Sequence, residues 1–127
     1  MSPKTQLMIC KTCRAGQALE PDDIRPGAQL LAAAQAGDIP EGVEVIAAPC
    51  LSNCKRGCTA MLRGGTDKWT YVYGNLDAAE DVGILLEAAA KYHATDDGVI
   101  PFAERPQKLK QNTMARVPPL TLSTQEA

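Results

Sequence analysis

Apolar and polar positions along the chain fall into short strand-like runs interrupted by helical stretches. The run Gln6–Cys10 is short and apolar, which predicts a buried strand that ends in a loop. Val43–Ala48 is β-branched and mostly apolar, which is typical of a central strand. Cys58–Arg63 and Trp69–Gly74 are two further strand-like runs, and the glycine-containing stretch between them predicts a hairpin.

Two segments have the pattern of helices. Pro26–Ala36 begins with a proline, is rich in strong helix formers and is followed by Gly37, where a helix commonly ends. The second segment spans residues 75–94, with Asn75 or Asp77 as the capping residue. Its expected buried stripe consists of Val82, Leu85, Leu86 and Ala89.

The pattern changes after residue 98. Residues 99–127 contain four prolines and scattered basic residues without apolar periodicity, which predicts an extended proline-rich tail. We therefore expect one domain over residues 1–98, followed by a tail over residues 99–127.

The order of the elements is strand, helix, strand, hairpin, helix. A strand, a crossover helix and a second strand make a right-handed parallel unit, and the hairpin and last helix complete an α/β, thioredoxin-like arrangement. We expect a central mixed sheet of about four strands with helices packed on it. If the first two strands are neighbours, their ends bring together four cysteines: Cys10, Cys13, Cys50 and Cys54.

Composition and charge limit the function classes. The chain has 127 residues, of which 45% are hydrophobic and 22% charged, and no apolar run approaches the length of a membrane helix. The N-terminus lacks the pattern of a secretory signal, so we expect a cytoplasmic protein. A net charge of -2 gives no general attraction for nucleic acid.

Five cysteines are several times the average usage for this length. An odd count without a signal sequence does not fit a secreted disulfide framework, and clustered thiols in a reducing compartment are more often metal ligands or redox groups. Four thiolates suit either a tetrahedral zinc ion or a [2Fe-2S] cluster, and the C-x3-C spacing of Cys50 and Cys54 mildly favours the cluster. A Rieske centre needs two histidines, and the chain has only His93.

Other interpretations stay open for these thiols. They could be ordinary buried cysteines, or Cys10 and Cys13 could form the C-x-x-C of a thiol-disulfide oxidoreductase. Cys58 is either an alternative ligand or a small apolar residue that opens the next strand, and the second is favoured. Four basic residues flank the thiols and could tune a cluster or dock an acidic redox partner: Lys11, Arg14, Lys55 and Arg56.

The stretch "CLSNCKRGCTAML" resembles the second cluster loop of the thioredoxin-like [2Fe-2S] ferredoxins, at Cys50, Leu51, Cys54 and Gly57. Ser52 replaces a glycine of that pattern and Cys58 a proline, and the family separates its first two ligands by more residues than the two between Cys10 and Cys13. The resemblance implies a one-electron carrier that is not an enzyme, and a homodimer.

A second resemblance covers nearly the whole chain. The stretches "CKTCR", "CLSNCKRGC", "YVYGNL", "DDGVIPFAERP" and "ARVPP" are similar to a bacterial family labelled only as predicted metal-binding proteins, sometimes found beside cobalamin-synthesis genes. We expect a [2Fe-2S] carrier with Cys10, Cys13, Cys50 and Cys54 as ligands. A zinc-binding structural or metal-delivery module is the alternative, and a thiol oxidoreductase the second.

Overall fold

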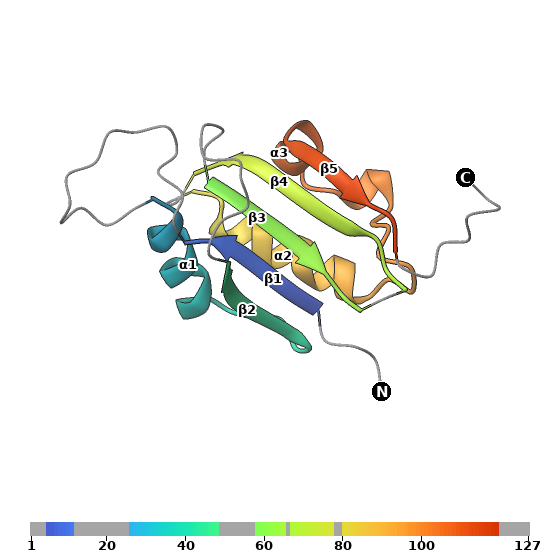
Figure 1. Cartoon of the computed structure of the whole chain (residues 1–127), viewed down its shortest axis with the longest axis horizontal. Coiled ribbons are helices and arrows are strands. Elements are labelled where there is room, and N and C mark those ends of the chain that lie inside the picture. The colour runs from blue at the N-terminus through green and yellow to red at the C-terminus, as the bar shows by residue number, and fades with distance from the viewer. Residues whose placement is uncertain (1–4, 12–25, 49–57, 66, 78–79, 120–127) are drawn as a thin grey trace.

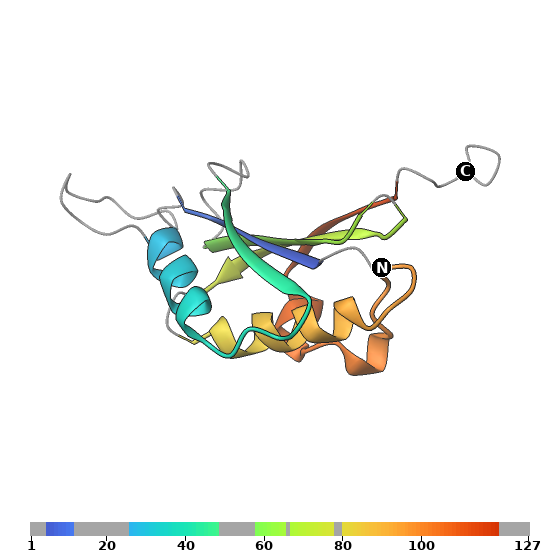
Figure 2. The same cartoon turned by 90° about the horizontal axis from the view of Figure 1, so that it is seen from below.

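A five-stranded sheet carries helices on one face in the computed structural model, which describes residues 5–11, 26–48, 58–65, 67–77 and 80–119 (Figures 1 and 2). The elements are β1 (Thr5–Cys10), α1 (Pro26–Ala36), β2 (Val43–Ala48), β3 (Cys58–Arg63), β4 (Thr70–Leu76), α2 (Val82–His93), a 3-10 helix η1 (Phe102–Glu104), α3 (Gln107–Gln111) and β5 (Thr113–Val117).

The strand order in the sheet is β2-β1-β3-β4-β5. β1 and β2 are parallel, and every other neighbouring pair is antiparallel. The predicted parallel unit with its crossover helix α1, the hairpin of β3 and β4 and the following helix α2 are all present. The expected α/β class is thereby confirmed, whereas the expected count of about four strands is too low by one.

Both long helices follow local sequence signals. α1 has its predicted bounds, from Pro26 at the first turn to Ala36 just before Gly37. α2 begins later than expected, because β4 continues to Leu76 and a separate turn precedes the helix. In that turn the Asp77 amide donates to Asp81 Oδ2 (2.6 Å), and the Glu80 amide donates to Asp77 Oδ1 (2.9 Å).

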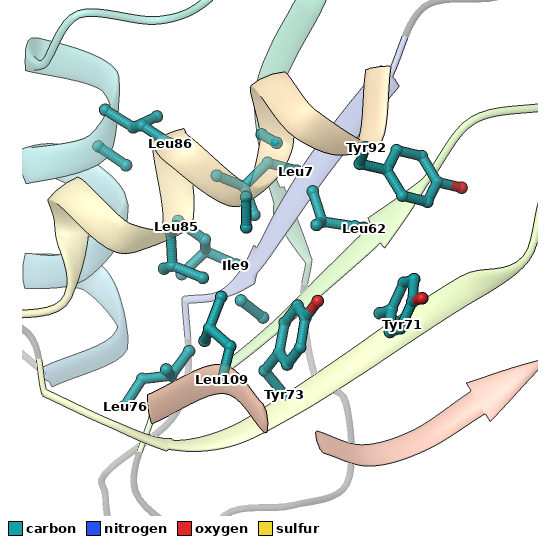
Figure 3. Close-up of a cluster of buried hydrophobic side chains, with 14 of the residues drawn as sticks. Leu7, Ile9, Leu62, Tyr71, Tyr73, Leu76, Leu85, Leu86, Tyr92 and Leu109 are labelled. Atoms are coloured by element: carbon teal, nitrogen blue, oxygen red, sulfur yellow. The ribbon is translucent and has the colours of Figure 1, made fainter. Parts of the chain in front are cut away.

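The core lies between the sheet and the helices (Figure 3). Leu7 and Ile9 of β1 and Leu85 of α2 have no exposed surface. Tyr71 and Tyr73 of β4 belong to the core cluster and stack with ring centroids 5.8 Å apart. Burial raises the pKa of the Tyr73 phenol, so this ring is neutral over the physiological range.

The segment after residue 98 differs from the extended tail that the sequence suggested. Its described part, residues 99–119, contains η1, α3 and β5, and β5 pairs with β4 to give the sheet its fifth strand. Leu109 of α3 is 1% exposed in the core, and Lys108 Nζ lies 2.7 Å from Asp81 Oδ2. A five-residue helix and a largely exposed edge strand are too short to produce apolar periodicity, so the sequence pattern did not indicate these elements.

A buried lysine closes the C-terminal end of α2. Lys68 Nζ donates to the carbonyls of Tyr92 (3.5 Å) and His93 (3.4 Å) and lies over the Tyr92 ring. Burial lowers the pKa of Lys68, and the carboxylates of Asp96 and Asp97 oppose that shift. Among the described residues, no helix is long and apolar enough to cross a membrane.

Candidate functional site

The two cysteine-bearing segments leave the sheet at the C-terminal ends of β1 and β2, which we call the cysteine edge. β1 and β2 are parallel and paired along their full length, with Cys10 opposite Ala48 at their C-terminal ends. The amide of Lys11 donates to the Ala48 carbonyl at 3.0 Å, which extends the ladder by one residue. The condition on which the convergence of the cysteine-bearing segments depends, that the first two strands are neighbours, is therefore met.

Cys10 and Ala48 are buried outside the helix-covered core. Their side chains are 2% and 1% exposed. Side chains alternate along a strand, so Cys10 points away from the face that carries Leu7 and Ile9. Neither Cys10 nor Ala48 belongs to the core cluster beneath the helices. Ala48 was missed by the sequence interpretation, and only the parallel register identifies it as the neighbour of Cys10.

Cys58 lies at the same edge but on the other face. It is the first residue of β3, is 1% exposed and belongs to the core cluster together with its β4 partner Leu76. This is the place expected of a small apolar residue that opens a strand. Cys10 and Cys58 therefore approach the edge from opposite sides of the sheet.

The remaining predicted ligands, Cys13, Cys50 and Cys54, lie outside the described residues, as do the basic residues Arg14, Lys55 and Arg56. Within the described part of the chain, no group of three or more His, Cys, Asp or Glu side chains gathers in a metal-binding arrangement. Lys11 is described, and its side chain is exposed directly after Cys10.

Comparison with known proteins places the chain in a family. A model for a protein of unknown function, DUF1636, matches residues 7–119. The chain belongs to the DUF1636 family. No curated protein and no solved structure matches it significantly.

The DUF1636 match runs from β1 to the residues after β5. It includes all five cysteines as well as the segment with η1, α3 and β5, so the family pattern extends well past residue 98. The cysteine edge and the fifth strand, β5, thus both lie within the DUF1636 match.

Two hollows that are lined by described residues lie on the helix side of the sheet. One, of about 660 Å³, is lined by the end of α2 and the residues that follow it, including Lys91, Asp97 and Glu104. The other, of about 460 Å³, lies between α2 and the residues after α1, including Gly37 and Leu86. Both are lined by residues of the helix layer, whereas Cys10 points to the opposite face of the sheet.

Proposed function

We propose that this DUF1636 protein is a thioredoxin-like one-electron carrier that holds a [2Fe-2S] cluster on Cys10, Cys13, Cys50 and Cys54. The observation that carries the proposal is the parallel register of β1 and β2, in which Cys10 lies opposite Ala48. The chain segments that carry the two cysteine pairs, Cys10 with Cys13 and Cys50 with Cys54, therefore both start from this position at the cysteine edge.

Covalent geometry limits how far the other thiols can be from this position. Each residue spans at most about 3.6 Å, so the Cα of Cys50 lies within about 7 Å of that of Ala48. By the same limit, the Cα of Cys13 lies within about 11 Å of that of Cys10. These limits allow the thiolates of Cys13 and Cys50 to join that of Cys10 at one small metal centre, and four thiolates are a donor set that a [2Fe-2S] cluster accepts.

The strand order supports the thioredoxin-like part of the proposal. The parallel pair β2-β1, the antiparallel hairpin β3-β4 beside it and the two helices on one face follow the order that the sequence predicts. β5 is an addition at the β4 edge and leaves the cysteine edge between β1 and β2 unchanged.

The burial of Cys10 favours a ligand over a thiol that exchanges disulfides. An attacking thiol has to meet its substrate at the surface, whereas Cys10 is 2% exposed. A cluster ligand needs no such access, and its burial shields the metal centre from solvent. When bound, a [2Fe-2S] cluster supplies reversible exchange of a single electron.

A basic residue beside Cys10 would partly neutralise the negative charge of the bound cluster. The cationic side chain of Lys11 follows Cys10 and is exposed, where it would favour the more negative reduced form and attract an acidic surface. We therefore propose an acidic redox protein as the partner, docked over the cysteine edge.

Anaerobic purification tests the proposal. We expect a brown protein with about two irons and two sulfides per chain, whose visible absorption is bleached by dithionite. A colourless protein with one tightly bound zinc would support the structural-module alternative and refute the carrier. A protein without metal that reduces a disulfide substrate would refute both.

Single substitutions assign the ligands. Cys10→Ser, Cys13→Ser, Cys50→Ser and Cys54→Ser should each lower the iron content or shift the visible spectrum. Cys58→Ala is the matched control, because this side chain faces the apolar core, and it should retain two irons per chain. Loss of the cluster in Cys58→Ala together with its retention in Cys13→Ser would contradict the proposed ligand set.

A further inference from the structure

The face of the sheet opposite α1 and α2 carries no described helix (Figure 2), and the pairing of β2, β1 and β3 arranges its side chains in rows across the three strands. Two of these rows keep part of their surface exposed. They consist of Glu44, Gln6 and Arg63, far from the cysteine edge, and of Ile46, Met8 and Met61, in the middle of the strands.

A third row lies at the cysteine edge and consists of Ala48, Cys10 and Thr59. We call it the buried row, because its side chains are 1%, 2% and 1% exposed. Ala48 lies opposite Cys10 in the parallel pairing of β2 and β1. In the antiparallel pairing of β1 and β3, Ile9 lies opposite Ala60, so the next residues along the two strands, Cys10 and Thr59, are opposite each other.

Thr59 points to the same side of the sheet as Cys10. Its neighbours in β3, Cys58 and Ala60, both belong to the core cluster on the helix side, and side chains alternate along a strand. Opposite residues of an antiparallel pair have Cβ atoms about 4.5–5.5 Å apart. At this separation the hydroxyl of Thr59 can reach the sulfur of Cys10.

We propose that the Thr59 hydroxyl donates a hydrogen bond to the Cys10 thiolate at the metal centre, which makes Thr59 a positioning residue that raises the reduction potential. This inference rests on the proposed function, because it takes Cys10 as a ligand. A hydroxyl has one donor and two acceptor positions, so Thr59 can accept another hydrogen bond and still donate to the sulfur.

The chemistry of the buried row favours this hydrogen bond. A bond to a charged acceptor such as a thiolate is roughly twice as strong as one between neutral groups, and exclusion of solvent strengthens it. Reduction adds a negative charge to the site, so a donor directed at a ligand sulfur stabilises the reduced form more than the oxidised form. Removal of the hydroxyl should therefore lower the reduction potential.

Lys11 provides a contrast, because its charge acts from the surface. Its side chain is exposed, whereas Thr59 is 1% exposed. Salt screens interactions of exposed charges strongly and those of buried groups much less. The contribution of Thr59 to the reduction potential should therefore persist at high salt, whereas that of Lys11 should fade.

Redox titration of the anaerobically purified full chain tests the proposal. Thr59→Val keeps the shape of the side chain and removes the hydroxyl, so the ratio of reduced to oxidised protein at a fixed potential should fall about tenfold, which is about 59 mV for one electron. Thr59→Ser keeps the hydroxyl and should restore the wild-type ratio. Between about 0.05 and 0.5 M salt, the shift of Thr59→Val should stay constant and that of Lys11→Gln should shrink. Thr59→Ala replaces Thr59→Val if the latter fails to fold by circular dichroism.

Metal affinity of the metal-free chain is a second readout, which needs no cluster. In a Co²⁺ titration followed by the thiolate-to-metal absorption, Thr59→Val should weaken binding about tenfold, because the hydrogen-bond partners of metal ligands contribute about this much. Thr59→Ser should bind as the wild type does. A protein that holds zinc in place of a cluster would refute the carrier but should still show this loss, so the two proposals fail separately.

Thr70→Val is the matched control. Thr70 precedes the core residue Tyr71 and therefore lies on the helix-free face, at the end of β4 that is far from the cysteine edge. Its substitution should change the ratio and the affinity by less than about twofold. A Thr59→Val variant with the wild-type ratio and affinity would overturn the proposal. So would a Thr59→Ser variant that shifts as far as Thr59→Val, a Thr59→Val shift that disappears at high salt, or a chain that binds no metal at all.

Discussion

Cys10 is paired with Ala48 across β1 and β2, and both side chains are almost completely buried on the face away from the helices. Lys11, the next residue, continues the ladder through its bond to the Ala48 carbonyl. Protein interiors are close-packed, so a side chain larger than that of alanine at position 48 has to displace its neighbours. The packing around Cys10 and Ala48 can therefore be tested by substitution at position 48.

Ala48→Val should lower the free energy of unfolding by about 1–3 kcal/mol, because two extra methyl groups enter a filled space. If the Cys10 thiolate binds the cluster, the iron content of the Ala48→Val variant should fall as well. Urea denaturation and iron analysis measure the two effects. Ala47→Val is the control, since Ala47 is exposed on the same strand and its substitution should change stability by less than about 0.5 kcal/mol. Equal effects at both positions would contradict a packed contact at Cys10.

The Lys108–Asp81 ion pair should make stability depend on alkaline pH. The hydrogen bond from Lys108 to Asp81 raises the pKa of Lys108 above its ordinary value of 10.5. A base whose pKa is raised by folding stabilises the fold fully below its unfolded pKa, and this contribution is lost as pH rises through the folded pKa. Lys108→Met should therefore lower the free energy of unfolding by about 1 kcal/mol at pH 7, and by less above about pH 10.5.

Urea unfolding of both proteins between pH 7 and 11 gives this difference. Buried tyrosines such as Tyr92, whose pKa is also raised by burial, titrate alike in both proteins and cancel. A difference in unfolding free energy that stays constant up to pH 11 would show that the pair contributes through packing alone.

Two glycines should respond in opposite directions to alanine. Gly98 has φ of +80°, and a Cβ there would lie 2.7 Å from the Trp69 amide nitrogen. Gly98→Ala should therefore destabilise the fold by about 1–3 kcal/mol. Gly83 lies in α2, and a Cβ there meets nothing within 4 Å, so Gly83→Ala should stabilise by about 0.5–1 kcal/mol. Thermal unfolding of the two variants measures both shifts, and a shift in the same direction would contradict this geometry.

Much of the fold was predictable because its signals are local. The bounds of α1 and β2 followed from Pro26, Gly37 and the run of β-branched residues, and β3 was predicted to the residue. The start of α2 was predicted too early, since Asp77 caps a turn of its own in place of the helix. Sequence spacing alone does not show whether Asp77 caps a separate turn or the helix α2 itself.

The site was predictable only through topology. Strand order brings the chain segments of Cys10 and Cys50 to one edge, and the parallel pairing confirms the part of that prediction that the structure describes. The burial of Ala48 beside Cys10 and the opposite orientation of Cys58 needed the register, which no local pattern encodes.

The segment after residue 98 provides the clearest test of how far the folded unit extends. Leu109 of α3 is 1% exposed and belongs to the same core cluster as Leu7 of β1 and Leu85 of α2 (Figure 3), so this segment contributes to the common core. Leu109→Ala should lower the free energy of unfolding by about 2–5 kcal/mol, because it leaves a cavity in that core. Gln111→Ala is the control on the exposed side of α3 and should change it by less than about 0.5 kcal/mol. If residues 99–119 folded independently of the domain, Leu109→Ala would leave the main urea transition unchanged; if they are part of one cooperative unit, tryptophan fluorescence and circular dichroism should shift together to the same lower midpoint.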